Sequence, residues 1–151
     1  MTSKERVLNR EKERGKAAAL ALAAKAPDMN GTQLIEAEDN IPAWSEQAVY
    51  TEEHIGFPVQ DNGQVFTILQ AHTPSHNPGV RPADLPAIYS IKHTTDPAKA
   101  KPYLAPHGTS GLYALGEVCT KDGKTWRSTM EGNPYPPNET GTETVWEEVV
   151  V

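Results

Sequence analysis

The spacing of hydrophobic and polar residues changes near Pro42, and this change separates a helical start from a β-rich remainder. Good helix formers dominate the chain up to Lys25, and Thr2 with Glu5 has the spacing of a capping box. Large apolar residues are few in this stretch, so its apolar face is thin. We therefore predict a helical arm that docks on a partner, with a frayed, partly disordered tail as the alternative.

A short connecting segment follows the predicted arm. Pro27 should end the first helix, because proline removes a backbone donor and clashes with the preceding turn. Asn30-Gly31 predicts a turn, and Thr32 is placed to cap a second short helix over residues 33–40. Beyond this segment, short β-prone runs alternate with turn signals, which is typical of small all-β units.

The β-rich part contains two similar stretches. In both, an apolar residue precedes a tyrosine, an Asn-Gly or Asp-Gly turn of the type I′ hairpin kind follows, and an aromatic stands three residues after the turn glycine. Both stretches close with a β-branched residue followed by an aromatic. This common order predicts a duplicated β unit with a small aromatic core. The predicted core aromatics are Trp44, Tyr50, Phe66, Tyr89, Tyr113, Trp126 and Trp146.

The predicted fold is mainly β with an N-terminal α-helix, and it contains two small tandem antiparallel β modules. We expect a helical arm over residues 1–26, a short helix and linker over 27–42, a first module (unit one) over 43–92, a linker over 93–102, and a second module (unit two) over 103–151. Units of this size bury little apolar area. We therefore expect the chain to assemble as a homo-oligomer.

The charge is unevenly distributed. The chain carries a net charge of −6. Residues 1–26 hold seven Lys/Arg and three Glu, which gives +4 and leaves −10 for the remainder. An acidic body argues against nucleic-acid binding, which depends on neutralising phosphates. The basic, alanine-rich start has some features of a signal peptide, but alanine drives insertion weakly and we favour a helix. No run reaches the roughly 18 apolar residues of a membrane span, so no membrane partner is predicted.

Few side chains suggest reactive chemistry. Cys119 is the one cysteine, so no internal disulfide can form, and its place in an apparent strand indicates a structural side chain. His72 and His76 are four residues apart, but Pro74 between them prevents the helix that would align them as metal ligands. No nucleophile–base pair, carboxylate dyad or phosphate-binding loop is recognisable. The sequence predicts a non-enzymatic protein with no catalytic residue, metal or cofactor.

Two stretches carry a resemblance to a known family. "IPAWSEQAVY…DNGQVFTILQAHTP…LPAIYSI" resembles the small carbohydrate-binding module of chitinases, and "GLYALGEVCTKDGKTWRSTMEGNP…VWEEV" follows the same order. The whole layout is similar to a group of tailed-phage virion proteins. The resemblance implies a virion structural protein on the surface of the capsid or tail, made in the host cytoplasm. It also implies that residues 1–26 contact other virion proteins and that the modules contact a cell-surface glycan.

Glycan binding by such modules uses an exposed flat ring, which stacks on the apolar face of a sugar. At the corresponding place unit one has "SHNPGVRP", without an aromatic, and unit two has Tyr135. Tyr135 is therefore the candidate glycan-binding residue. The alternative function is a genuine chitin- or cell-wall-binding module of a secreted or glycan-degrading assembly, and the scarcity of edge aromatics counts against it.

Overall fold

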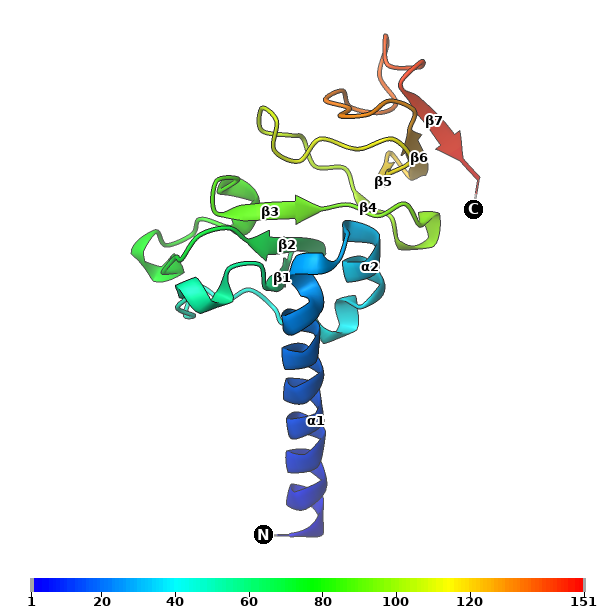
Figure 1. The fold of residues 1–151 in the computed structure, drawn as a ribbon. Helices are drawn as coiled ribbons and strands as arrows, with labels where there is room; N and C mark the ends of the chain where they lie inside the picture. Colours follow the sequence, from blue (N-terminus) through cyan, green and yellow to red (C-terminus); the bar gives the residue numbers. More distant parts are fainter. Residues whose placement is uncertain (1, 151) are drawn as a thin grey trace.

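The computed structural model describes residues 2–150, apart from the side chains of Glu5 and residues 7–13. Helix α1 (Ser3–Lys25) projects from the rest of the molecule as a stem, and the β strands lie beyond its C-terminal end (Figure 1). Thr2 therefore occupies the N-cap position that the sequence predicts. The Glu5 half of the predicted capping box lies outside the described residues.

The C-terminal end of α1 packs into the body. Pro27 stands in a 3-10 turn, η1 (Ala26–Asp28), so α1 ends where proline predicts. A hydrophobic cluster then joins the end of α1 to the next helix and to the first sheet. Its buried members are Leu22, Ala26, Leu34, Ile35, Ile41 and Val65. Leu22 and Ala26 thus join the end of the helix to a core, and the segment that follows is packed into the same core.

The second helix, α2 (Gly31–Glu36), begins earlier than predicted. Asn30 is its N-cap: the Asn30 side chain accepts from the backbone N–H of Gln33 at 2.9 Å, and the Gln33 side chain accepts from the Asn30 N–H at 3.0 Å. The predicted cap at Thr32 is therefore wrong, because an asparagine two residues earlier satisfies the free N–H groups. The Thr32 hydroxyl instead accepts from the backbone N–H of Thr95 at 2.9 Å.

The strands form two sheets. Unit one has β1 (Pro58–Asp61), β2 (Gln64–Ile68) and β3 (Tyr89–Lys92), all antiparallel and in that order. Unit two has β4 (Lys101–Pro102), β5 (Val118–Lys121), β6 (Lys124–Ser128) and β7 (Trp146–Val149), with β4 parallel to β5 and the others antiparallel. The remaining 3-10 turns are η2 (Glu38–Asn40), η3 (Glu52–His54), η4 (Pro74–His76), η5 (Pro82–Asp84) and η6 (Pro97–Lys99).

The predicted fold class is confirmed, since an N-terminal helix precedes two largely antiparallel sheets (Figure 1). Helical residues are nevertheless at least as numerous as strand residues, because α1 alone contributes 23. The description "mainly β" therefore suits the two units better than the whole chain.

Both hairpin turns have the predicted geometry. Asn62 and Gly63 join β1 to β2 with φ angles of 50° and 75°, and Asp122 and Gly123 join β5 to β6 with φ angles of 54° and 75°. Positive φ at both central positions is the requirement of a type I′ turn, which Asn-Gly and Asp-Gly meet at little cost. These dipeptides therefore set the register of both hairpins.

The two units also share backbone hydrogen bonds outside the turns. The Gly56 N–H donates to the Ile68 carbonyl at 2.8 Å, and the Gly116 N–H donates to the Ser128 carbonyl at 2.9 Å. Both glycines have a φ of 88°, a value that L side chains rarely adopt. Units one and two are therefore built on the same local backbone.

Residues 93–102 are packed between the units. The Thr94 carbonyl accepts from the Val118 N–H at 2.8 Å, and the ring of His93 stacks on Tyr113 with 3.8 Å between centroids. Gly31 of α2 lies against the same place, since a Cβ atom there would be 2.1 Å from the His93 carbonyl oxygen. The stretch predicted as a linker is thus a tight junction between α2, unit one and unit two.

Candidate functional site

Tyr89 is at the centre of the unit-one core. Its ring meets the edges of Tyr50 and Phe66 with centroids 6.4 Å apart in both pairs, and its hydroxyl accepts from the Trp44 indole N–H at 2.9 Å. Burial raises the pKa of Tyr89. Trp44, Phe66 and Tyr89 are buried and Tyr50 is half-buried, so these predicted core aromatics form one packed cluster.

Tyr113 holds the same place in unit two. It stacks on Tyr103 at 5.6 Å on one hand and on His93 at 3.8 Å on the other, and Trp146 meets it edge-on at 5.3 Å. Burial raises the pKa of Tyr113 well above its usual range. Cys119 lies in the same cluster, where burial raises the pKa of its thiol to about 12 and leaves it protonated and unreactive at neutral pH.

Tyr103 is the unit-two counterpart of Trp44, although the pattern of residues in the sequence does not pair the two. The Trp44 N–H donates to the Gln60 carbonyl at 2.8 Å, and the Tyr103 N–H donates to the Thr120 carbonyl at 2.8 Å. Tyr103 therefore stands where Trp44 stands in unit one. The sequence hides this correspondence because the residue type differs and because the spacings differ. Tyr50 follows Trp44 by six residues, whereas Tyr113 follows Tyr103 by ten.

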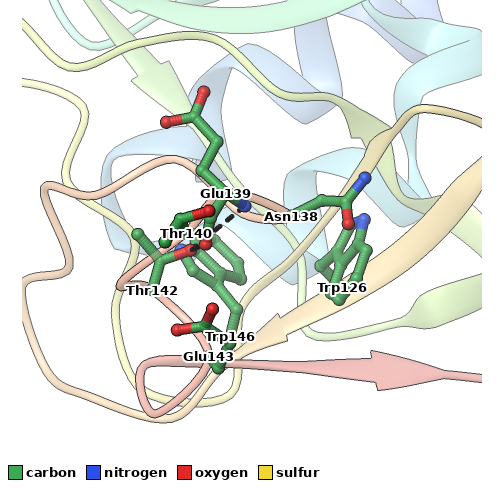
Figure 2. A pocket seen from close by; sticks show the side chains of 7 residues that line it. All are labelled: Trp126, Asn138, Glu139, Thr140, Thr142, Glu143 and Trp146. Atoms are coloured by element: carbon green, nitrogen blue, oxygen red, sulfur yellow. Dashed lines mark hydrogen bonds between the residues drawn. The ribbon is translucent and has the colours of Figure 1, made fainter.

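Trp126 differs from its counterpart Phe66 because it borders an open groove. Trp126 pairs with Glu148 across β6 and β7, so Trp146, two residues along β7, is its diagonal neighbour on the same sheet face. The loop of residues 138–143 runs beside them. Together they enclose a groove of about 420 Å³. Its lining residues are Trp126, Asn138, Glu139, Thr140, Thr142, Glu143 and Trp146 (Figure 2).

Local hydrogen bonds fix the walls of this groove. The Trp126 indole N–H donates to the Lys121 carbonyl at 3.2 Å, which holds the ring at the groove edge. The Thr142 hydroxyl donates to the Glu139 carbonyl at 2.9 Å and closes the turn of the loop (Figure 2). The Glu143 carboxylate accepts from the Gly141 N–H at 2.9 Å. The groove therefore offers an aromatic face beside hydroxyl, amide and carboxylate groups that are already positioned.

Unit one has no equivalent opening beside Phe66, because side chains fill it. Phe66 is 2% exposed, and Ala83 and Leu85 from the loop before β3 pack against its cluster. The Arg81 guanidinium lies 5.3 Å from the centroid of the Trp44 ring and covers that aromatic as well. Phe66 and Trp44 are therefore closed to a ligand, whereas Trp126, the unit-two counterpart of Phe66, borders a groove.

In comparisons with known proteins, no family model and no curated protein matches the chain. The geometry of the units and of the groove therefore carries the functional argument, together with the resemblance noted in the sequence.

Tyr135, the candidate glycan-binding residue from the sequence, lies next to the groove but does not line it. Its side chain is exposed, at 50%, while its backbone is held by two hydrogen bonds. The Trp146 indole N–H donates to its carbonyl at 2.8 Å, and its own N–H donates to the Asn133 side-chain oxygen at 3.0 Å. The structure thus separates Tyr135 from Trp126, the ring that sequence reasoning assigned to the core.

A second hollow lies where α1 leaves the body. It measures about 360 Å³ and is largely apolar. Its lining residues are Lys16, Ala19, Leu20, Ala23, Pro42, His54, Phe57 and Pro58. Leu20 is 68% exposed beside it, so the base of the predicted arm presents apolar surface on a helix whose described N-terminal side chains are exposed.

Two further features concern the part of the chain that the structure describes. Among the described side chains, which leave out those of Glu5 and residues 7–13, no three His, Cys, Asp or Glu are grouped so that they could hold a metal ion. No described helix combines the length and the apolar character needed to cross a membrane.

Proposed function

We propose that this chain is a non-enzymatic virion structural protein that is anchored through α1 and contacts host glycans weakly through unit two. The virion setting rests on the sequence resemblance to tailed-phage proteins with tandem chitinase-type modules. Within this setting the chain is a decoration or tail component on the particle surface. Unit one then acts as a spacer that joins the anchoring helix to the adhesive unit.

The groove beside Trp126 is the single observation that carries the glycan contact. A sugar ring presents an apolar C–H face and a rim of hydroxyl groups. The indole ring can pack against the first, and Asn138, Thr140 and Glu139 offer hydrogen-bonding groups to the second. A volume of about 420 Å³ lies in the range of small-molecule sites, roughly 300–1,000 Å³.

The exposed stem supports the anchoring role. α1 extends beyond the body, and among its described side chains the buried ones, Leu22 and Ala23, lie in its last turns. The apolar hollow at its base, next to Leu20, gives a neighbouring subunit or another virion protein a surface to cover. Burial of exposed apolar area is the main driving force for such association.

Retention on insoluble chitin, peptidoglycan and cell-wall polysaccharide tests the glycan contact. We expect the wild type to be retained on at least one of them, and Trp126→Ala to lose about tenfold in affinity, because Trp anchors contribute most of the binding energy in such sites. Tyr135→Ala is the matched control, as it removes an exposed ring outside the groove. Equal retention of wild type and Trp126→Ala contradicts the proposal.

Shortening α1 tests the anchor. A variant that lacks residues 2–20 loses Ala19 and Leu20 from the apolar hollow but keeps Leu22 and Ala26, which belong to the core, so it should fold. We expect it to be monomeric in sedimentation and to be missing from purified particles, while it still binds glycan. Normal incorporation of this variant would show that α1 is not the anchor.

A further inference from the structure

The groove of unit two has an excess of negative charge. Two carboxylates, Glu139 and Glu143, line it, and no Lys or Arg side chain is among its lining residues. Glu139 is paired with Lys121 at 3.0 Å. Among the described residues Glu143 has no ion-pair partner, and its one hydrogen bond comes from a backbone N–H within its own loop. Glu143 is thus a carboxylate at the groove wall whose charge no side chain offsets.

The aromatic wall of the groove already attracts a cation. The ammonium of Lys124 lies 6.0 Å from the centroid of the Trp126 ring, within the range of a cation–π interaction. The same ammonium is 3.9 Å from Glu148, and both of these side chains are about half exposed. Lys124 does not line the groove, so this contact lies outside it. It shows that the ring can hold a cation, while the part of Trp126 that lines the groove stays available to a ligand ammonium.

The carboxylate of Glu143 and the ring of Trp126 both favour a positively charged group on the ligand. A neutral sugar uses the ring face of Trp126 and the hydroxyl groups of the loop, but it gains nothing from the charge on Glu143. A sugar with a free, protonated amino group gains both the carboxylate and the ring quadrupole. Because the groove is open to solvent, the gain is that of an exposed ion pair rather than a buried one.

We propose that the groove of unit two prefers glycans that carry free amino groups, such as de-N-acetylated amino sugars, over their N-acetylated forms. This inference rests on the proposed glycan-binding function of unit two and adds the class of sugar. Glu143 is the residue that sets the preference, and Trp126 binds both forms.

Titration of the full-length protein with chitosan oligomers and with chitin oligomers of equal length, at weakly acidic pH, tests the preference. We expect about threefold tighter binding of the free-amine form, which is the size of an exposed ion pair. The difference should shrink when salt is added, because salt screens exposed charges.

Glu143→Gln removes the negative charge but keeps the shape of the side chain. The amide also keeps an oxygen acceptor for the Gly141 N–H. The substitution should abolish the preference, so that the variant binds the two oligomers with equal affinity. Glu147→Gln is the matched control, because Glu147 follows Trp146 on β7, is paired with Arg127 and points to the sheet face opposite that of Trp146.

The outcomes distinguish the two proposals. Equal affinity for both oligomers, or an equal effect of Glu143→Gln and Glu147→Gln, overturns the preference while glycan binding stands. Lack of binding of either oligomer to the wild type overturns the glycan-binding function itself, and with it the preference.

Discussion

Phe66 in unit one and Trp126 in unit two occupy the same place in the same hairpin, yet Phe66 is fully enclosed and Trp126 is only partly buried and borders a groove. Phe66 is covered by a cluster to which Ala83 and Leu85 contribute, whereas the loop beside Trp126 carries asparagine, glutamate and threonine. A shared backbone therefore supports a filled core in one copy and a groove in the other. The side chains of the loop before the last strand decide which of the two arises.

The two units also differ at the end of the second hairpin strand, where unit one has an apolar residue and unit two a polar one. Ile68 of unit one is replaced by Ser128 in unit two, and the buried Asn133 donates to the Ser128 hydroxyl at 3.1 Å and to the Val145 carbonyl at 2.8 Å. Unit two thus replaces apolar packing by a hydrogen-bonded network whose partners are all satisfied. Such networks hold a unique geometry as long as no member is lost.

Truncating the two equivalent aromatics should give the largest effect and tests the comparison directly. Phe66→Ala should lower the free energy of unfolding by about 3–5 kcal/mol, the usual cost of emptying a core phenylalanine site. Trp126→Ala should cost roughly 1–2 kcal/mol, because part of that ring is already in water. Urea unfolding followed by circular dichroism measures both. Equal losses would mean that Trp126 is as much a core residue as Phe66.

Lowering the pH should weaken the junction that joins the units. Burial lowers the pKa of His93 to about 4, helped by the nearby Lys92 and opposed by the hydrogen bond to the Gly111 carbonyl. The folded state therefore binds its proton less readily than the unfolded chain, whose pKa is about 6.5. The contribution of neutral His93 to the free energy of unfolding is fully present above pH 6.5. It is lost as the pH falls towards 4, and the loss is about 3 kcal/mol in total.

Unfolding free energies measured across this pH range test the His93 assignment. His93→Gln should remove most of the pH dependence, while the exposed His107→Gln should leave it intact. If the wild type and His93→Gln have the same slope, the junction is not the acid-sensitive element.

Two glycine substitutions should change the free energy of unfolding in opposite directions, and they test whether α2 and the two units are tightly packed at the junction. A Cβ at Gly31 would lie 2.1 Å from the His93 carbonyl oxygen, so Gly31→Ala should cost about 1–3 kcal/mol. Gly15 has no atom within 4 Å of such a Cβ, and Gly15→Ala should stabilise α1 by about 0.5–1 kcal/mol. Thermal unfolding compares them, and a neutral Gly31→Ala would show that α2 is not tightly held at the junction.

The parts of the fold that follow from local chemistry could be predicted from the sequence. The Asn-Gly and Asp-Gly turns impose positive φ, so both hairpins are where they were expected, and Pro27 stands just after the end of α1. The cap of α2 was assigned to Thr32, because the sequence does not tell which of two neighbouring polar side chains will reach the helix N–H groups. Asn30 does so here.

The groove could not be predicted in the same way, because it depends on what two loops place over one sheet face. The sequence predicts Tyr135 as the glycan-binding residue and Trp126 as a core aromatic. Trp126 does pack against the cluster of Tyr113, Cys119 and Trp146, but it also lines the groove, which Tyr135 does not. A signal was present in the sequence. The loop before the last strand is apolar in "ADLPAI" of unit one and polar in "NETGTETV" of unit two, and the polar loop leaves Trp126 at the edge of a groove.

The central claim is that unit two, and not unit one, carries the accessible ligand site. Titration of the isotopically labelled protein with amino-sugar oligomers, followed by ¹H–¹⁵N NMR, tests it most directly. We predict chemical-shift changes at the Trp126 indole N–H and at the backbone N–H groups of residues 138–143, with none at residues 77–85 of unit one. Changes at residues 77–85 instead, or none in either unit at saturating oligomer, would contradict the account.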